Sequence, residues 1–370
     1  MHIVHTEASQ GWGGQEIRIL GEAAGMMGRG HRVTLLCPGT AQIFAGAARY
    51  GVSAEVLPIG RKNFTGLIAL RNWLKGHPVD VINTHSSTDS WLAALACASL
   101  PQAPPIVRTR HISTAVPNNL ATRWLYRRAT RHIVTTGTAL REQLIRDNGI
   151  DGGMLTSVPT GIDLKAFAPG DRKAAREALG LPLDATIVGI VATLRDWKGH
   201  DYLIEAFARL QREENFPRLR LLMVGDGPQR PHIEGLIAAR GLQQEVLMPG
   251  NQPQVARWLQ AMDLFSLPSY ANEGVPQALM QAMACALPVI STPVGSITEI
   301  IESERTGLLV LPKDVDALHG ALVRLLADTA LRQRLGAAAR EEALRRFGDN
   351  IMLDRMEAVF RDAVLSERRK

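Results

Sequence analysis

A repeated alternation of short apolar segments with helical segments constrains the fold of this chain more than any other feature. The apolar segments are rich in Val, Ile and Leu, as expected of parallel strands covered on both faces. Strands are expected at 1–6, 32–37, 79–84, 105–109, 131–135 and 154–158, and again at 186–192, 219–224, 244–248, 263–268, 288–291 and 307–311. This order predicts an α/β fold with two Rossmann-like, doubly wound parallel sheets.

The length of 370 residues also favours two domains, because a single hydrophobic core rarely organises a chain of that size. Turn-forming residues cluster between Asp163 and Thr186, so the boundary is expected there. We predict an N-terminal domain at 1–165 and a C-terminal domain at 166–345. The segment 346–370 reads as helix, and we expect it to pack back on the N-terminal domain.

Composition argues for a soluble, cytoplasmic protein. Apolar residues at 46% and charged residues at 21% are ordinary for a globular chain. Cys37, Cys97 and Cys285 are widely spaced, which fits a reducing compartment. The N-terminus lacks the features of a signal peptide, and no apolar run reaches the ~20 residues that a membrane span needs.

Positive charge is concentrated in the first half of the chain. Residues 1–165 hold 17 Lys or Arg against 10 Asp or Glu, whereas residues 166–370 hold 25 against 26. This pattern predicts either a solvated helix face or a surface that meets an anionic acceptor or the anionic inner membrane. Nucleic acid is not expected as a partner, because aromatic residues are only 5% and no recognition motif is present. The arginines that suggest such a surface are Arg108, Arg110, Arg123, Arg127, Arg128 and Arg131.

A glycine-rich loop, Gly11-Trp-Gly13-Gly14, follows the first strand and precedes a helix expected to begin near Gln15. Glycines let an anion or a polar acceptor approach the backbone, and a helix start carries partial positive charge. The loop is equally compatible with a purely structural turn. It lacks the G-x-G-x-x-G spacing of dinucleotide dehydrogenases.

Two cations follow the strand at 186–192, in the stretch from Thr193 to Gly199. Arg195 and Lys198 stand at the carboxyl end of that strand, where open α/β sheets bind their ligands. There they could neutralise a diphosphate whose negative charge grows as a glycosidic bond breaks. The alternative is an ordinary pair of surface charges.

The most informative segment runs from Pro268 to Ile290 and places Glu273 in a loop before a helix that Pro276 is expected to start. Amides near Gly274 and Val275 could hold phosphate, Glu273 a sugar hydroxyl and Gln281 a ribose hydroxyl. An acidic residue at a helix N-terminus is the plain structural alternative for Glu273.

Together these motifs resemble the pattern of the retaining family 4 glycosyltransferases of the GT-B fold, in which a glutamate, seven residues and a second glutamate form the signature. The resemblance covers nearly the whole chain. Gly13-Gly14, Gly30-His31-x-Val33, Val158–Asp163 and Lys198-Gly199 all stand in the order of the family.

The resemblance implies roles for residues that match by position. His111 and Glu273 correspond to the histidine near the reacting sugar and to the donor-sugar carboxylate. Gly13 and His85 are expected on the acceptor side. The donor diphosphate is expected to contact Gly14, Arg195, Lys198, Gly274 and Val275, and the ribose Gln281.

The implied reaction is transfer of a hexose from a nucleotide-diphosphate sugar, held in a cleft between the domains, to a glycan or lipid-linked acceptor. Retention of anomeric configuration and a place in cell-surface polysaccharide or lipopolysaccharide synthesis follow from the same resemblance, with contact to the anionic inner membrane as one possibility for the basic half.

The sequence departs from the family pattern at three places. Gln281 replaces the second glutamate and loses its charge, which puts base preference in question. Ala192-Thr193 replaces a Gly-Arg pair, leaving Arg195 as the substitute cation. Thr160-Gly161 replaces an Asn-Gly pair.

No metal cofactor is expected. The D-x-D sequence, Asp314-Val-Asp316, follows Pro312 and begins a helical run, so it is predicted to be a helix cap. Lys198, Arg195 and helix N-termini would supply the positive charge instead.

Two other functions fit the same fold and ligand. A sugar-nucleotide 2-epimerase would need additional carboxylates at the sugar carbon, and no convincing one is seen. A noncatalytic nucleotide-sugar sensor would be expected to lack Glu273. A nicotinamide oxidoreductase is disfavoured by the missing glycine fingerprint.

Overall fold

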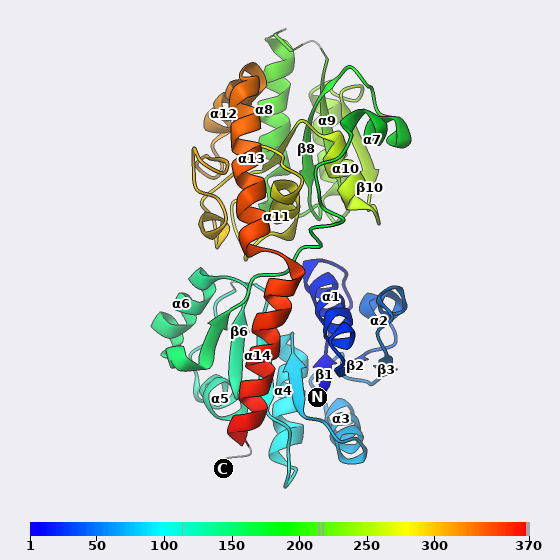
Figure 1. Ribbon diagram of the computed structural model, residues 1–370, viewed down its shortest axis with the longest axis vertical. Coiled ribbons are helices and arrows are strands. Elements are labelled where there is room, and N and C mark those ends of the chain that lie inside the picture. The colour runs from blue at the N-terminus through cyan, green and yellow to red at the C-terminus, as the bar shows by residue number, and fades with distance from the viewer. Residues whose placement is uncertain (113, 214, 217, 368–370) are drawn as a thin grey trace. The chain divides into compact units, whose positions relative to one another are not determined.

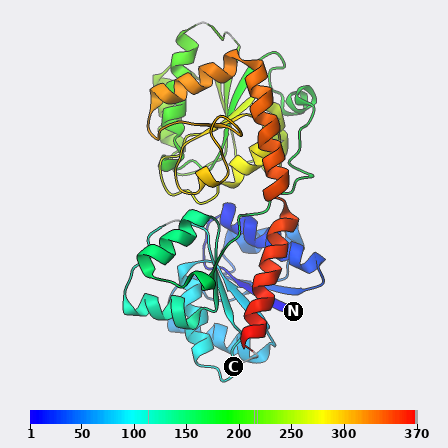
Figure 2. The same ribbon diagram turned by 60° about the vertical axis from the view of Figure 1, so that its left-hand side comes forward.

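The computed structural model describes residues 1–112, 114–213, 215–216 and 218–367, and the chain forms two compact units (Figures 1 and 2). Unit 1 comprises Met1–Gly161 and Asp349–Lys370, and unit 2 comprises Ile162–Gly348. The chain therefore leaves unit 1, builds unit 2 and returns. The predicted boundaries, 165/166 and 345/346, lie a few residues from these; residues 368–370 are outside the described part.

The sheet of unit 1 is parallel throughout, with strand order β3-β2-β1-β4-β5-β6-β7. All six predicted strands are present, each within two residues of its expected start. The seventh, β3, escaped prediction because it has only three residues and none is buried. The strands are β1 (His2–Thr6), β2 (Arg32–Cys37), β3 (Ala54–Val56), β4 (Val81–Thr84), β5 (Ile106–Arg110), β6 (His132–Thr135) and β7 (Leu155–Ser157).

Two apolar cores cover the two faces of this sheet. One contains side chains of α1, α2 and the C-terminal helix α14, and the other contains side chains of α3, α4 and α6. Met356 and Phe360 of α14 are fully buried, so this helix belongs to unit 1 (Figure 1). The helices are α1 (Gly14–Gly28), α2 (Gln42–Ala47), α3 (Phe64–Gly76), α4 (Ser87–Ala98), α5 (Leu120–Trp124), α6 (Thr138–Asn148) and α14 (Asp349–Glu367).

The sheet of unit 2 is also parallel, with strand order β10-β9-β8-β11-β12-β13. All six strands were predicted, although β13 is shorter than the expected 307–311. The strands are β8 (Thr186–Val191), β9 (Leu219–Val224), β10 (Val246–Gly250), β11 (Leu264–Leu267), β12 (Val289–Ser291) and β13 (Leu308–Leu309).

The helices α7 to α13 share one apolar core with this second sheet. Phe207 of α8, Phe265 of β11 and Leu279 of α11 lie in its fully buried centre. The helices are α7 (Arg172–Leu179), α8 (His200–Arg212), α9 (Arg230–Ala239), α10 (Val255–Ala261), α11 (Gln277–Ala284), α12 (Val315–Ala327) and α13 (Thr329–Arg346).

Both sheets change direction of strand order beside their first strand, between β1 and β4 in unit 1 and between β8 and β11 in unit 2. Loops that leave the carboxyl ends of neighbouring strands on either side of such a point diverge and leave room for a ligand. We therefore expect a binding site at the loops that follow these strands. No helix among the described residues is long and apolar enough to cross a membrane.

Candidate active site

Four loops of unit 2 meet at the carboxyl edge of its sheet. They follow β8, β9, β11 and β12, and backbone hydrogen bonds connect them. Tyr270 N donates to Trp197 O at 2.8 Å, and Leu194 N donates to Asp226 O at 3.0 Å. The loops therefore form one connected surface at this edge of the sheet.

Lys198 and Glu273, predicted as the phosphate cation and the sugar carboxylate, form an ion pair on this surface. Lys198 Nζ lies 2.6 Å from Glu273 Oε1. Ser269 Oγ donates to the same oxygen at 2.6 Å. Glu273 is only 4% exposed, so its charge is largely withdrawn from water and depends on these two partners.

Glycines in the left-handed region hold the loops around this pair. Gly199 has φ +79°, and a Cβ there would lie 2.0 Å from Pro268 O. Gly295 has φ +59°, and a Cβ there would lie 2.0 Å from Glu273 O. A side chain at Gly199 would push the Lys198 loop away from the Glu273 loop, and one at Gly295 would push the loop after β12 away from Glu273. Both glycines are therefore required by close backbone approach.

The other predicted donor residues of unit 2 take different positions. Arg195 is exposed, with its guanidinium carbon 5.7 Å from the Trp197 ring centroid. Gly274 lies in the loop before α11, whereas the Val275 side chain is buried in the core. Gln281 is partly exposed in the middle of α11. Helix α11 begins at Gln277, directly after Pro276, as predicted.

In unit 1, the glycine loop leads into α1 as expected. Gly13 is the N-cap and Gly14 the first helical residue. Glu7, which follows β1, stabilises both ends of this loop. It accepts hydrogen bonds from Ser9 N at 2.7 Å and from the Gln15 side chain. Burial, reinforced by the nearby Asp89 carboxyl, raises the pKa of Glu7 to about 8.

The two predicted histidines of unit 1 belong to a chain of three imidazoles. His85 Nδ1 lies 3.0 Å from His111 Nε2, and His85 Nε2 lies 2.9 Å from His5 Nδ1. Burial lowers the pKa of His5 to about 3 and those of His85 and His111 well below the usual value, with neighbouring positive charge adding to the effect. All three rings are therefore neutral near pH 7.

A network of buried polar side chains accompanies the three histidines. Arg18 donates to Val158 O at 2.7 Å and pairs with Glu22 at 3.7 Å, both side chains being fully buried. Asn83 donates to Glu22 and accepts from Thr109, which ties β4 and β5 to α1. The Arg18 charge is among the causes that lower the pKa of His111.

Sequence reasoning missed His5, Glu7 and Ser269. Each had a usable signal: Glu7 follows the first strand directly, Ser269 stands four residues before Glu273, and His5 is a polar residue inside an apolar strand. A buried polar side chain needs a partner, and that requirement would have directed attention to His5.

The six arginines of the basic stretch do not all lie on a solvated helix face, which was one of the two expectations for them. Arg108 and Arg110 are in β5, and Arg108 is 4% exposed, so it cannot belong to a solvated helix face. Arg123, Arg127 and Arg128 are exposed, and Arg131 donates to Ser366. The other expectation, a surface that meets an anionic acceptor or the anionic inner membrane, stays a prediction.

The D-x-D sequence is a helix cap, as predicted. Asp314 accepts a hydrogen bond from Ala317 N at 2.8 Å, and Asp316 pairs with Arg209. Among the described residues, no group of three or more His, Cys, Asp or Glu is arranged to hold a metal ion.

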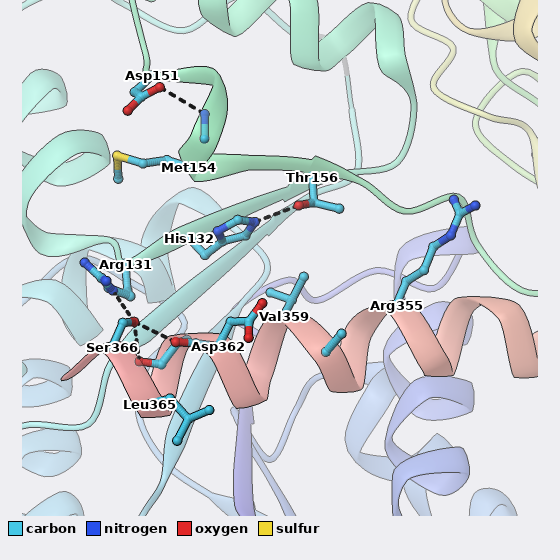
Figure 3. A pocket seen from close by; sticks show the side chains of 13 residues that line it. Arg131, His132, Asp151, Met154, Thr156, Arg355, Val359, Asp362, Leu365 and Ser366 are labelled. Atoms are coloured by element: carbon cyan, nitrogen blue, oxygen red, sulfur yellow. Dashed lines mark hydrogen bonds between the residues drawn. The ribbon is translucent and has the colours of Figure 1, made fainter. Parts of the chain in front are cut away.

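A groove of about 740 Å³ lies elsewhere in unit 1, between α14 and the strands β6 and β7 (Figure 3). Two hydrogen bonds join residues that line it. His132 Nε2 and Thr156 Oγ1 are hydrogen-bonded at 2.9 Å, and Arg131 Nε donates to Ser366 Oγ of α14 at 2.8 Å. His132 and Met154 mark the amino ends of these strands. None of the predicted site residues lines the groove.

Comparison with known proteins identifies the family of the chain. Residues 12–166 match the model of Glycosyltransferase Family 4, and residues 171–342 match that of Glycosyl transferases group 1. A D-inositol 3-phosphate glycosyltransferase of Kribbella flavida is 30% identical over 307 residues, which cover 77% of this chain and 71% of the relative. Another of that name, from Stackebrandtia nassauensis, is 35% identical over 222 residues, 58% of this chain but only 50% of the relative.

The fold has a counterpart among solved structures. Anabaena HepE in complex with UDP-glucose superposes with a TM-score of 0.85 at 21% identity, covering 98% of this chain and 100% of the other. The two parallel-sheet units thus have the GT-B architecture. The two family models together match most of the chain, and the relative from Kribbella flavida is matched over most of both chains. This chain therefore belongs to the family 4 glycosyltransferases.

Proposed function

We propose that this protein is a retaining glycosyltransferase that moves a hexose from a nucleotide-diphosphate sugar to a glycan or lipid-linked acceptor. The observation that carries the proposal is the Lys198–Glu273 pair at the carboxyl edge of the unit 2 sheet. It places a cation for a diphosphate beside a carboxylate for sugar hydroxyls. The UDP-glucose bound by a GT-B neighbour supports a nucleotide sugar as the donor.

In the proposed reaction, Lys198 leaves Glu273 and binds the diphosphate, and Glu273 accepts hydrogen bonds from hydroxyls of the sugar. The phosphate gains negative charge as the glycosidic bond breaks, so the ammonium group binds the transition state more strongly than the ground state. Ser269 keeps Glu273 oriented once Lys198 has moved, because it bonds the same carboxylate oxygen.

The acceptor is assigned to unit 1, beside the glycine loop and the histidine chain. A neutral His111 does not add positive charge near a cationic sugar ring, and it can exchange hydrogen bonds with sugar hydroxyls. We place Gly13, His85 and His111 on this side, with His111 at the reacting sugar.

We further propose that no divalent metal takes part. Lys198 and the start of α11 supply the positive charge that a metal would otherwise provide, and Arg195 stands exposed in the same loop as Lys198. Turnover that persists unchanged in EDTA is the expected result. An absolute requirement for added Mg²⁺ or Mn²⁺ contradicts this part of the proposal.

The test is a thermal-shift screen against UDP-, GDP-, ADP- and dTDP-sugars. A donor at 100 times its dissociation constant stabilises the folded state by about 2.7 kcal/mol. The same donor is then incubated with candidate glycan and lipid-linked acceptors, and the anomeric configuration of the product is read by NMR. Absence of any stabilising nucleotide sugar, or an inverted product, contradicts the proposal.

A role in cell-surface polysaccharide synthesis, at the cytoplasmic face of the inner membrane, is the setting we propose for this reaction. The excess positive charge of residues 1–165 supports contact with anionic lipid. Sedimentation with vesicles containing anionic lipid, compared with zwitterionic vesicles, tests this contact.

A further inference from the structure

His111 stands at the start of an irregular segment. Between the end of β5 at Arg110 and the start of α5 at Leu120, none of the described residues belongs to a helix or a strand. A segment without a backbone ladder of its own is held by side chains and by neighbouring elements. The position of the His111 ring therefore depends on contacts made outside regular structure.

Arg110 supplies such contacts from the end of the strand. Its Nη2 donates to Thr114 O at 2.8 Å and to Ile112 O at 3.3 Å, so one guanidinium group bonds two carbonyl groups of the segment. Its Nη1 donates to the Tyr126 hydroxyl at 2.7 Å. A planar guanidinium serves several acceptors in fixed directions, which a single ammonium group cannot do. Both Nη atoms are thus committed to acceptors of the protein itself, and they hold the backbone that follows His111.

Tyr126 is a buried anchor for this guanidinium group. It is 3% exposed and lies in the π-helical turn η2 (Leu125–Ala129), which follows α5. The Arg108 guanidinium carbon lies 4.4 Å from the centroid of its ring. Residues two apart on a strand share a face, which explains how Arg108 and Arg110 of β5 both contact one tyrosine. Turns of this kind are rare and recur at functional sites.

The remaining contacts around His111 act on its ring and on two carbonyl groups. His111 Nε2 lies 3.0 Å from His85 Nδ1, and the His111 carbonyl oxygen accepts from Thr136 Oγ1 at 3.4 Å. The Arg110 carbonyl oxygen accepts from Thr136 N at 3.3 Å. Both bonds from Thr136 are longer than usual, so the shorter bonds from Arg110 are the main restraint on the backbone after His111. After burial and Arg18, the positive charge of Arg110 also lowers the pKa of His111.

We propose that Arg110, anchored on Tyr126, is a positioning residue for His111 and fixes where the imidazole meets the reacting sugar. A displacement of about 1 Å at a reacting group costs on the order of 10²-fold in rate. A residue that holds the backbone of His111 therefore controls turnover without touching the substrate. The inference rests on the proposed function, in which His111 lies at the reacting sugar.

Two conservative substitutions test this role. Arg110→Lys keeps the positive charge but replaces the guanidinium fork by one ammonium group, and Tyr126→Phe removes only the hydroxyl that accepts from Arg110. Arg71→Lys is the matched control, because it breaks a hydrogen bond from Arg71 Nε to Ser99 Oγ away from His111. Circular dichroism first compares each variant with the parent. Should Arg110→Lys not fold, Tyr126→Phe decides the proposal.

Turnover is measured with the donor and acceptor that the nucleotide-sugar screen identifies. We expect Arg110→Lys to lower kcat about tenfold or more and Tyr126→Phe to lower it by a smaller factor. The acceptor KM and the UDP affinity should stay within about twofold of the parent, because Arg110 touches neither ligand. Parent-level kcat in Arg110→Lys overturns the role. A higher acceptor KM with unchanged kcat also overturns it, since Arg110 would then bind the acceptor directly.

The double variant tests the route through Tyr126. If Arg110 and Tyr126 act through one hydrogen bond, the kcat of the double variant should be close to that of Arg110→Lys alone, because the bond is already lost there. Residues that act independently give fold losses that multiply. Multiplied losses overturn the link between Tyr126 and the positioning of His111.

A measurement without substrate separates this inference from the proposed function. Nitrogen NMR of ¹⁵N-histidine protein reports the His111 ring, whose Nε2 contacts His85. The His111 signals should move in Arg110→Lys and stay unchanged in Arg71→Lys. Unchanged His111 signals in Arg110→Lys, with turnover of a nucleotide sugar by the parent, remove only the positioning role. Failure of every nucleotide sugar to react removes the proposed function, and His111 signals that move still show that Arg110 holds His111.

Discussion

Lys198 and Glu273 neutralise one another at the carboxyl edge of the unit 2 sheet, with Lys198 Nζ 2.6 Å from Glu273 Oε1. The side chains come from loops after β8 and β11, whose strands are neighbours in the sheet. Under the proposed function, a diphosphate would compete with Glu273 for Lys198. The ion pair compensates a buried charge, and its opening would free the Glu273 carboxylate for sugar hydroxyls.

Removal of the cation should weaken donor binding. We expect Lys198→Ala to reduce UDP affinity by on the order of 2 kcal/mol or more, because the diphosphate would lose its charge partner while the Glu273 side chain remains nearby. Calorimetric titration with UDP measures the effect. Uridine, which has no phosphate, is the control ligand, and an equal loss of affinity for uridine would assign the effect to general damage.

Replacement of Glu273 by glutamine should separate binding from turnover. Glu273→Gln keeps the size of the side chain and removes its charge, so Lys198 is free to meet the diphosphate and UDP affinity should be unchanged or higher. Turnover should fall by about 10²-fold or more if the carboxylate contacts the sugar in the transition state. Wild-type turnover in Glu273→Gln is incompatible with that contact.

The glycine that joins the two loops provides a stability test. Gly199→Ala places a Cβ 2.0 Å from Pro268 O at φ +79° and should destabilise unit 2 by about 1–3 kcal/mol. Gly235→Ala, in α9, meets no atom within 4 Å and should stabilise by about 0.5–1 kcal/mol. Thermal unfolding of both variants gives the comparison; a Gly199→Ala protein as stable as Gly235→Ala contradicts the proposed close approach.

The sequence was sufficient to predict where strands and helices follow one another along the chain, because strands of a covered parallel sheet are apolar on both faces. It placed Lys198 and Glu273 at strand ends, but their mutual contact depends on β8 and β11 being neighbours, which the sequence order alone does not state. The strand β3 was missed because strands were predicted from runs of apolar residues. It has only three residues, and none of them is buried.

Long-range pairing also explains what was misread in unit 1. Arg108 lies within the predicted strand at 105–109, but its burial depends on side-chain packing that the sequence does not state. His85 and His111 were found separately, since the hydrogen bond that joins them spans two strands. Residues whose roles depend on neighbours 26 or more positions away had no local pattern to reveal them.

Glu7 should make stability depend on pH. Its pKa in the folded protein is raised to about 8, so the native state holds a proton that the unfolded chain releases near its ordinary value of 4.5. The stabilisation that the Glu7 proton gives the folded state is fully present below pH 4.5 and is lost as pH rises through about 8. Glu7→Gln, which stays neutral, should therefore unfold at a higher temperature than the parent at pH 9.

The difference between the two proteins should shrink toward pH 5, and each kcal/mol corresponds to roughly 2–4 °C. Glu55→Gln is the control: this glutamate of β3 is partly exposed and accepts a hydrogen bond from Trp73 Nε1, and its replacement should not change the slope. Parallel pH profiles for Glu7→Gln and the parent would mean that Glu7 is ionised in the folded state.

The histidine chain should have a single direction of proton donation. His5 Nε2 is buried and has no hydrogen-bond partner among the described residues. A buried N–H without an acceptor is rarer than an acceptor without a donor, so Nε2 should carry no proton. His5 then donates from Nδ1 to His85, and His85 donates from Nδ1 to His111 Nε2. His111 is thereby left with its proton on Nδ1, which makes that nitrogen a hydrogen-bond donor.

Nitrogen NMR of protein labelled with ¹⁵N-histidine tests this direction, because bare and protonated ring nitrogens have distinct shifts. We expect His85 and His111 protonated at Nδ1 and no titration between pH 6 and 8, since burial keeps all three rings neutral. His5→Phe removes the first donor and should release His85 to the other tautomer, whereas substitution of the exposed His232 should leave the spectrum of the chain unchanged. A proton found on Nε2 of His111 in the parent would reverse the direction and make His111 an acceptor at Nδ1.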